Sequence, residues 1–139
     1  MASDELPTFG SEEWADQLKN SLNNNPNYAD SAKSWEGALV LEFLAEGIKL
    51  QEDAFIWMDL WHGECRDIKF LASRDELETA YYITAKESVW ADLIAGNFKP
   101  QEALMTGKFK MSGDIGKLMR FPKAAGYIIK YLARLLQNW

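Results

Sequence analysis

The sequence predicts an α+β domain with a five-stranded, mostly antiparallel sheet. Apolar residues recur about every fourth position in residues 11–34 and again near the C-terminal end, as they do along one face of a helix. Between residues 37 and 84 the period falls to two, which is typical of strands. A chain of 139 residues is the usual size of one domain. We therefore expect a single domain over residues 11–139, preceded by a flexible segment over residues 1–10.

Two helices are predicted at the start of the domain. Ser11 is a typical N-cap residue, and large apolar side chains follow it at four-residue spacing: Trp14, Leu18 and Leu22. Pro26 suits the first turn of a second, short helix, which we expect to end near Ser34. The first helix is therefore amphipathic, with one face available for the core.

Strands are predicted next, over residues 37–43, on both sides of a turn at Gly63 within residues 54–71, over 79–84, and finally over 107–111. In the first two strands, alternate apolar residues share one face: Leu39, Leu41, Phe43, Ile56, Met58 and Leu60. The opposite face of the second strand carries Phe55, Trp57, Asp59 and Trp61. That face is apolar enough to need partial cover.

The remaining chain is predicted to be helical. Thr84 and Glu87 have the spacing of a capping box, which places a helix over residues 87–95. After the fifth strand, Pro122 interrupts the helical pattern because proline cannot continue the hydrogen-bond ladder. The last helix has an apolar stripe that includes Ile128 and ends at Trp139, and its opposite face is basic, with Lys123, Lys130 and Arg134.

Composition and charge exclude several classes of function. Residues 1–106 hold 8 Lys and Arg against 20 Asp and Glu, whereas residues 107–139 hold 7 against 1, so the two parts carry −12 and +6. The acidic majority argues against nucleic acid as a partner. With no apolar run near 20 residues and no signal peptide at the N-terminus, we expect a soluble, cytoplasmic protein.

The candidate catalytic and metal-binding motifs are incomplete. Gly107, Gly113 and Gly116 fit neither a phosphate-binding loop nor a dinucleotide fingerprint. His62 and Cys65 are the chain's one histidine and one cysteine, which leaves too few ligands for a zinc site. The carboxylates on the strands, Glu42, Asp59 and Asp67, fit the wet face of an antiparallel sheet. We therefore predict no catalytic residues, no metal and no cofactor.

The segment Phe98 to Phe121, FKPQEALMTGKFKMSGDIGKLMRF, closely resembles the signature of the sterol carrier protein 2-like lipid-transfer domains. In that family a segment N-P-x-x-A-x-x-x-G-K-(apolar)-K-(apolar)-x-G-(D/N) forms the last strand and leads into a C-terminal helix rich in Leu and Met. The residues that fit it are Lys99-Pro100, Ala103, Gly107-Lys108, Lys110 and Gly113-Asp114. The order of elements over residues 11–139 is also similar to that of the family.

The resemblance implies helices over one face of the sheet, enclosing an apolar tunnel for a fatty acid, an acyl-CoA, a sterol or a similar lipid. It implies an intracellular lipid-binding or lipid-transfer protein that is not an enzyme. The side chains expected to line the tunnel are Leu39, Leu41, Phe43, Ile56, Met58, Leu60, Trp90, Phe98, Leu104, Phe109, Met111 and Met119. The expected partners are the lipid itself and, through Lys123, Lys130 and Arg134, an anionic membrane, and the protein would be a monomer or a homodimer.

Two other classes of function stay open at this point. The same fold with a filled core could be an interaction module that uses Trp57 and Trp61 to bind a partner or a second copy. An enzyme acting on a lipid-like substrate would need a buried polar group in the tunnel, and Tyr82, Thr84 or Asp114 could supply one. A pocket of about 300 Å³ or more would favour the carrier.

Overall fold

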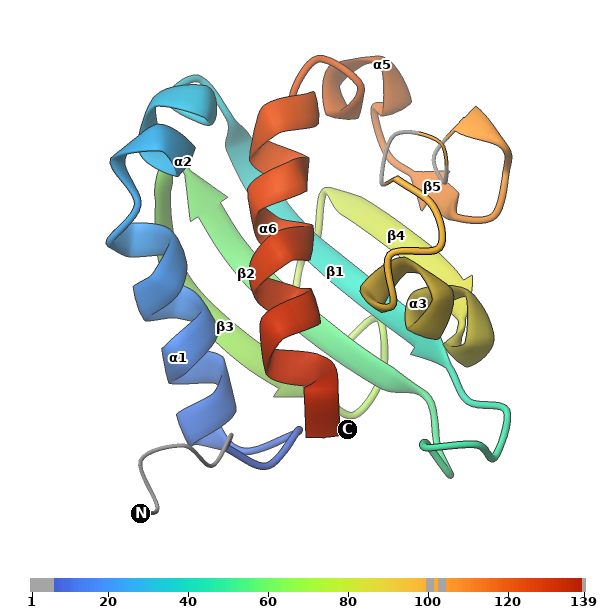
Figure 1. Cartoon of the computed structure of the whole chain (residues 1–139). Helices are drawn as coiled ribbons and strands as arrows, with labels where there is room; N and C mark the ends of the chain where they lie inside the picture. Colours follow the sequence, from blue (N-terminus) through green and yellow to red (C-terminus); the bar gives the residue numbers. More distant parts are fainter. Residues whose placement is uncertain (1–6, 100–101, 103–104, 139) are drawn as a thin grey trace.

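The centre of the computed structural model, which describes residues 7–99, 102 and 105–138, is a mixed β-sheet (Figure 1). Its five strands in the described residues are β1 (Glu36–Leu44), β2 (Ala54–Trp61), β3 (Glu64–Leu71), β4 (Tyr81–Lys86) and β5 (Lys110–Ser112). The strands lie in the order β3-β2-β1-β4-β5. The β1–β4 pair is parallel and the other three pairs are antiparallel. The predicted fold class is thereby confirmed.

The parallel pair follows from the route that residues 72–80 take from β3 to the far side of β1. On that route the Trp57 indole N–H donates a hydrogen bond to the Glu78 backbone carbonyl, over 3.3 Å. Trp57 lies on the sheet face opposite the helices and is half-buried, and Val40 on the same face is fully buried. The connection therefore supplies the partial cover that the sequence predicts for this face.

The helices cover the other face of the sheet (Figure 1). They are α1 (Glu12–Asn23), α2 (Pro26–Ser31), α3 (Glu87–Ile94), α5 (Ile115–Leu118) and α6 (Pro122–Leu135), followed by a 3₁₀ turn, Leu136–Asn138. The Ser11 hydroxyl accepts a hydrogen bond from the Trp14 backbone N–H, as its predicted N-cap role requires. The Trp14 indole N–H donates to the Leu135 carbonyl over 3.1 Å, which ties α1 to the end of α6. None of the helices in the described part of the chain has the length and apolar character needed to cross a membrane.

The predicted capping box before α3 is wrong. Strand β4 continues through Lys86, which is the N-cap residue and makes no side-chain capping bond. The Thr84 hydroxyl donates instead to the Glu42 carboxylate across the β1–β4 pair, over 3.0 Å. Thr84 is paired in the sheet and cannot also lie at the helix start, so the local spacing is overridden by the strand register.

The bounds of the fifth strand also differ from the prediction. The fifth strand covers only residues 110–112, so Phe109 reaches the core from just before it. In the N-terminal segment predicted to be flexible, the Phe9 ring packs edge-on against Trp14 at 5.2 Å and Phe70 at 5.1 Å. Residues 1–6 and Trp139 lie outside the described residues.

Candidate functional site

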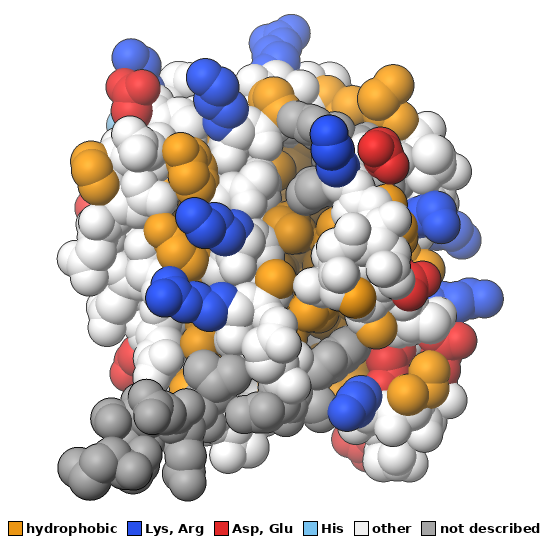
Figure 2. All heavy atoms as spheres, viewed as in Figure 1, with side chains coloured by type: hydrophobic (Ala, Val, Ile, Leu, Met, Phe, Trp, Pro, Cys, Tyr) orange, Lys and Arg blue, Asp and Glu red, His pale blue; other side chains and the backbone are white. Residues whose placement is uncertain are grey.

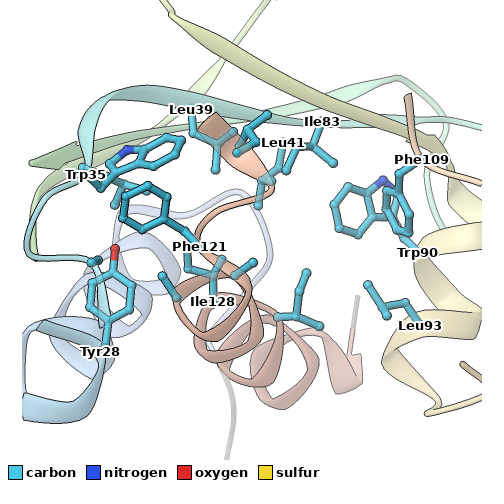
Figure 3. Close-up of a pocket in the computed structure, with 16 residues that line it drawn as sticks. Tyr28, Trp35, Leu39, Leu41, Ile83, Trp90, Leu93, Phe109, Phe121 and Ile128 are labelled. Atoms are coloured by element: carbon cyan, nitrogen blue, oxygen red, sulfur yellow. The ribbon is translucent and has the colours of Figure 1, made fainter. Parts of the chain in front are cut away.

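An apolar cavity lies between the sheet and α6 (Figure 3). Its volume is about 70 Å³. The side chains that line it are Tyr28, Ala32, Trp35, Leu39, Leu41, Leu60, Ile83, Trp90, Leu93, Phe109, Leu118, Phe121, Ala124, Ala125, Ile128 and Ile129. Figure 2 shows hydrophobic side chains deep in a hollow beside α6, toward α3. The cavity is therefore lined by apolar side chains and reaches the surface.

The sheet and α6 form the floor and roof of the cavity. Leu39 and Leu41 alternate along β1 and share its inner face, and Leu41 is paired in register with Ile83 of β4. On α6, Ala124 and Ile128 are four residues apart and so lie on one face of the helix. Alanine at this position keeps the roof from filling the space above the floor.

At one end of the cavity Trp90 of α3 forms a fixed wall. Its ring is stacked on Phe43 with centroids 4.2 Å apart, and Phe109 packs edge-on against it at 4.7 Å. Its indole N–H donates to the Glu42 backbone carbonyl over 3.1 Å. Trp90 is fully buried, so this end of the cavity is defined by an aromatic cluster with its one polar atom satisfied.

The buried carboxylate of Glu87 fixes α3 to the connection between β1 and β2. It accepts hydrogen bonds from the backbone N–H groups of Glu46 (2.9 Å), Ile48 (3.4 Å), Lys49 and Leu50 (2.8 Å). Burial alone would raise the pKa of Glu87, but these donors together lower the pKa below its usual value. The Glu87 carboxylate therefore fixes the first turn of α3 to the β1–β2 connection.

At the other end, Trp35 and Phe121 close the cavity below α5. The Phe121 ring packs edge-on against Trp35 at 5.1 Å, and Tyr81 lies 4.7 Å from the same indole. The Lys117 ammonium lies 5.7 Å from the Trp35 ring and donates to the Glu36 carbonyl over 3.3 Å. This end is thus closed by ring contacts and one half-buried cation.

The described groups near the cavity offer little chemistry. Burial raises the pKa of Tyr28, so its hydroxyl stays neutral in the physiological range. Burial likewise raises the pKa of the Cys65 thiol to about 12. Within the described ranges no three His, Cys, Asp or Glu side chains are grouped to hold a metal ion. The cavity can enclose an apolar group, and its lining supplies no charged side chain.

Five of the side chains predicted to line a tunnel line this cavity: Leu39, Leu41, Leu60, Trp90 and Phe109. Phe43, Ile56 and Met58 are fully buried but do not line it. Helix α1 covers that part of the sheet and fills the space there. Ile56 is paired with Phe70, and the Phe70 ring lies 5.4 Å from Trp14 of α1.

The other predicted lining residues lie toward the edge. Phe98 is half-buried with the Lys108 ammonium 4.9 Å from its ring, Met111 is half-buried on β5, and Met119 is exposed. Leu104 lies outside the described residues. Sequence reasoning missed Trp35, Ile83 and Phe121, although the apolar stripe on α6 did point to Ile128 as a core residue.

The residues named for the two other classes of function lie away from the cavity. Trp61 is 39% exposed and stacks on the His62 ring at 5.0 Å, with the Arg66 guanidinium also 5.0 Å from it. Tyr82 donates to the Arg74 carbonyl, and Asp114 accepts from the Lys117 backbone N–H. Tyr82, Thr84 and Asp114 do not line the cavity. None of them therefore supplies the buried polar group that an enzyme would need in it.

An apolar cavity under a layer of helices, on an open five-stranded sheet, is typical of proteins that hold apolar ligands. The model of the SCP-2 sterol transfer family matches residues 15–125, and the chain belongs to that family. It is therefore a lipid-binding or lipid-transfer domain.

Solved structures agree with this assignment. A crystal structure of sterol carrier protein 2 is 30% identical to the chain, covers 91% of it and 98% of its own length, and gives a TM-score of 0.79. The solution structure of a conserved hypothetical protein from Thermus thermophilus is 28% identical, covers 92% and 90%, and gives 0.77. Sterol carrier protein 2 from Yarrowia lipolytica in its apo form, 20% identical over the whole of both chains, gives 0.54 and shares the fold. No curated protein matches the sequence.

Proposed function

We propose that the protein binds one apolar lipid in the cavity above β1 and carries it through water between membranes or to an enzyme. The proposed ligand is a fatty acid, a fatty acyl-CoA or a sterol-like molecule. The observation that carries the proposal is the cavity itself, whose lining has no charged side chain and which reaches the surface beside α6. Family membership supports the same class of ligand.

Burial of methylene groups would supply the affinity. At about 0.8 kcal/mol per CH₂, a chain of about 14 methylenes gains roughly 11 kcal/mol before the costs of ordering are subtracted. The 70 Å³ cavity is smaller than the roughly 300–1,000 Å³ of typical ligand pockets, so it does not reach the size that would by itself favour a carrier over an interaction module. Loading therefore requires the cavity to widen, and a tunnel of that size would exist only in the loaded protein.

The extent of widening decides which predicted residues touch the lipid. Leu39, Leu41, Leu60, Trp90 and Phe109 would contact it from the outset. Phe43, Ile56 and Met58 lie deeper, whereas Phe98, Met111 and Met119 lie toward the edge strand and α5. We propose that Phe98 and Met111 join the site when α5 moves outward, whereas Met119 lies on the exposed side of α5.

Release of the lipid also requires contact with a membrane. Lys123, Lys130 and Arg134 are exposed on α6, and Figure 2 shows Lys and Arg side chains beside hydrophobic ones over this helix. Cations near a membrane surface contribute about 1 kcal/mol each toward binding anionic lipid. We propose that these three residues help draw the carrier to anionic membranes.

A filled cavity tests lipid binding directly. Ala124→Phe places a ring in the roof of the cavity, whereas Ala133→Phe makes the same change at a half-buried position of α6 that does not line it. Native mass spectrometry with added palmitate, palmitoyl-CoA or a sterol should show complexes with the parent protein and Ala133→Phe, and at least tenfold fewer with Ala124→Phe. If the parent binds none of these lipids below about 100 μM, a weak affinity, lipid carriage is disproved.

A further inference from the structure

Exposed apolar side chains gather in one segment of the chain. The described residues include five large hydrophobic side chains that are exposed, and three of them fall within residues 105–119: Met105 (78%), Ile115 (46%) and Met119 (44%). The other two, Ile48 and Trp61, are isolated, and isolated exposed residues are normal. A cluster of this kind points to a partner that covers it.

Helix α5 is apolar on both its inner and its outer side. Leu118 and, just after the helix, Phe121 line the cavity. Ile115 and Met119 are four residues apart, so they share a face, and that face is exposed. Ile115 and Met119 are thus an exposed apolar pair beside a helix that also carries Lys117. The outer side of α5 therefore fits an apolar environment that the isolated chain does not provide.

Cations surround this exposed side. Lys117, Arg120 and Lys123 lie within seven residues, and among the described residues neither Arg120 nor Lys123 has a carboxylate partner. The carboxylate of Asp114 accepts the Lys117 backbone N–H over 3.1 Å. Across a polar groove from α5, Asp30 is paired with Lys33 at 3.7 Å. The rim of the apolar patch is therefore positively charged on balance.

We propose that this surface, made by Ile115, Lys117, Met119, Arg120 and Lys123 and called the α5 face here, docks on the surface of an anionic membrane. Ile115 and Met119 enter the boundary between head groups and acyl chains, and the cations lie against the anionic head groups. Because docking serves the lipid carriage proposed above, the position matters: the cavity closes directly beneath α5, at Phe121 and Leu118. A membrane that takes up the outer side of α5 can draw it away from the cavity and open the way for the lipid.

Partition onto vesicles tests the apolar part of the α5 face. Ile115→Ser removes one exposed isoleucine from it, and Ile48→Ser makes the same change on the connection between β1 and β2. On phosphatidylcholine vesicles that contain phosphatidylserine, Ile115→Ser should bind about fivefold more weakly. Docking would bury the exposed half of the Ile115 side chain in the membrane, and serine gives up that apolar contribution. Ile48→Ser should bind like the parent. Equal binding by Ile115→Ser and the parent would overturn the proposal.

The charged part has its own signature. Arg120→Gln and Lys123→Gln should each weaken binding to these vesicles about fivefold at low salt. The difference from the parent should narrow at 0.15 M salt, where screening shortens the attraction to about 8 Å. Both variants should bind like the parent to vesicles of phosphatidylcholine alone. Losses of the same size on those neutral vesicles would show that the cations do not meet anionic head groups.

A dye at one position locates the contact. Cys65 is fully buried with a raised pKa, so a new exposed cysteine can be labelled selectively. A polarity-sensitive dye at Met119→Cys should shift to the blue on vesicles with phosphatidylserine, and the same dye at Ser73→Cys, on the connection that covers the other face of the sheet, should not. A shift at both positions, or at neither, overturns the proposal. So does a shift at residue 119 that follows protein concentration without vesicles, because the occupant would then be a second copy.

Lipid carriage and docking can fail separately in these experiments. Vesicle binding by the protein is measured whether or not its cavity holds a ligand, and complex formation with palmitate by mass spectrometry needs no vesicle. If the protein binds palmitate but the dye at residue 119 does not shift on vesicles, lipid carriage stands and docking through the α5 face is overturned.

Discussion

The two ends of the cavity are built differently. At the α3 end, Glu87 accepts four backbone N–H groups and Trp90 joins an aromatic stack while its indole N–H is satisfied by β1. At the α5 end, the three-residue strand β5 is held by its antiparallel pairing with β4, and the four-residue helix α5 by the Phe121–Trp35 contact and by Lys117. The α3 end is fixed by buried polar bonds, whereas the α5 end is held by a short strand pairing and by ring contacts.

This difference indicates where the cavity widens. Segments with few buried contacts open at lower free energy than those tied into the core. The α5 end combines that weak attachment with the exposed apolar residues Ile115 and Met119. The fixed end would therefore keep the shape of the site while the α5 end admits the ligand.

The largest expected effect comes from breaking the fixed end. Glu87→Ala should lower the free energy of unfolding by about 4 kcal/mol, because several backbone N–H groups in the β1–β2 connection lose their buried, charged acceptor. Urea denaturation followed by tryptophan fluorescence measures this. A loss under about 1 kcal/mol would show that water satisfies these backbone N–H groups equally well, and that Glu87 does not fix α3 to the β1–β2 connection.

The pH dependence of Glu87→Gln provides the control. The pKa of Glu87 is lowered in the folded protein relative to its ordinary value of 4.5, so its carboxylate stabilises the fold fully above that value. This contribution is lost as the pH falls through the lower folded-state pKa. The amide of Glu87→Gln does not titrate, so the stability gap between parent and variant should be constant near neutral pH and narrow below pH 4.5. A gap that stays constant into acid would mean that the carboxylate charge is not what the donors recognise.

The sequence predicted the sheet well because each strand carries its own signal. Alternation along residues 37–43 and 54–71 identified the faces of β1, β2 and β3 correctly, and the turn at Gly63 was placed where the structure has it. The capping box failed because its evidence was local: Thr84 and Glu87 had the right spacing, but each found a distant partner, Glu42 and residues 46–50. Long-range pairing of this kind is invisible in spacing.

The site was less predictable than the sheet. Alternation told which strand residues face the helices, but not that α1 covers Ile56 and Met58 while the space above Leu39 and Leu41 stays open. That depends on where helices distant in sequence pack. The missed residue Phe121 precedes Pro122, and the break there was recognised only as the end of a helix. Its role in closing the cavity follows from contact with Trp35, which lies 86 positions away along the chain.

A smaller effect is expected from a glycine at the α5 end. Gly113 has φ of +104°, and a Cβ there would lie 2.4 Å from the Ala80 carbonyl oxygen, so Gly113→Ala should cost about 3 kcal/mol in unfolding free energy. Gly107 also has positive φ, at +77°, but open space around its Cβ position, so Gly107→Ala should cost about 1 kcal/mol. Thermal and urea unfolding compare the two. If both cost the same, the close approach of β4 to the turn before α5 contributes nothing.

The smallest effect should come from loosening α5 without disturbing the core. Lys117→Gln removes the ammonium that lies over Trp35 and Tyr81, at a cost of about 0.5 kcal/mol for a single cation near the surface and 5.7 Å from a ring. Lys130→Gln is the matched control, because Lys130 is an exposed cation on α6 with no ring or carboxylate partner among the described residues. Stopped-flow displacement of a fluorescent fatty acid, without vesicles so that docking does not enter, should show release about twofold faster for Lys117→Gln only. Hydrogen exchange should speed up at the Leu118 and Met119 amides, which bond to Asp114 and Ile115, and stay unchanged at the Ala95 amide after α3. Equal acceleration at α3 and α5 would mean that the cavity opens as one unit, and the two ends would then differ in their contacts but not in their function.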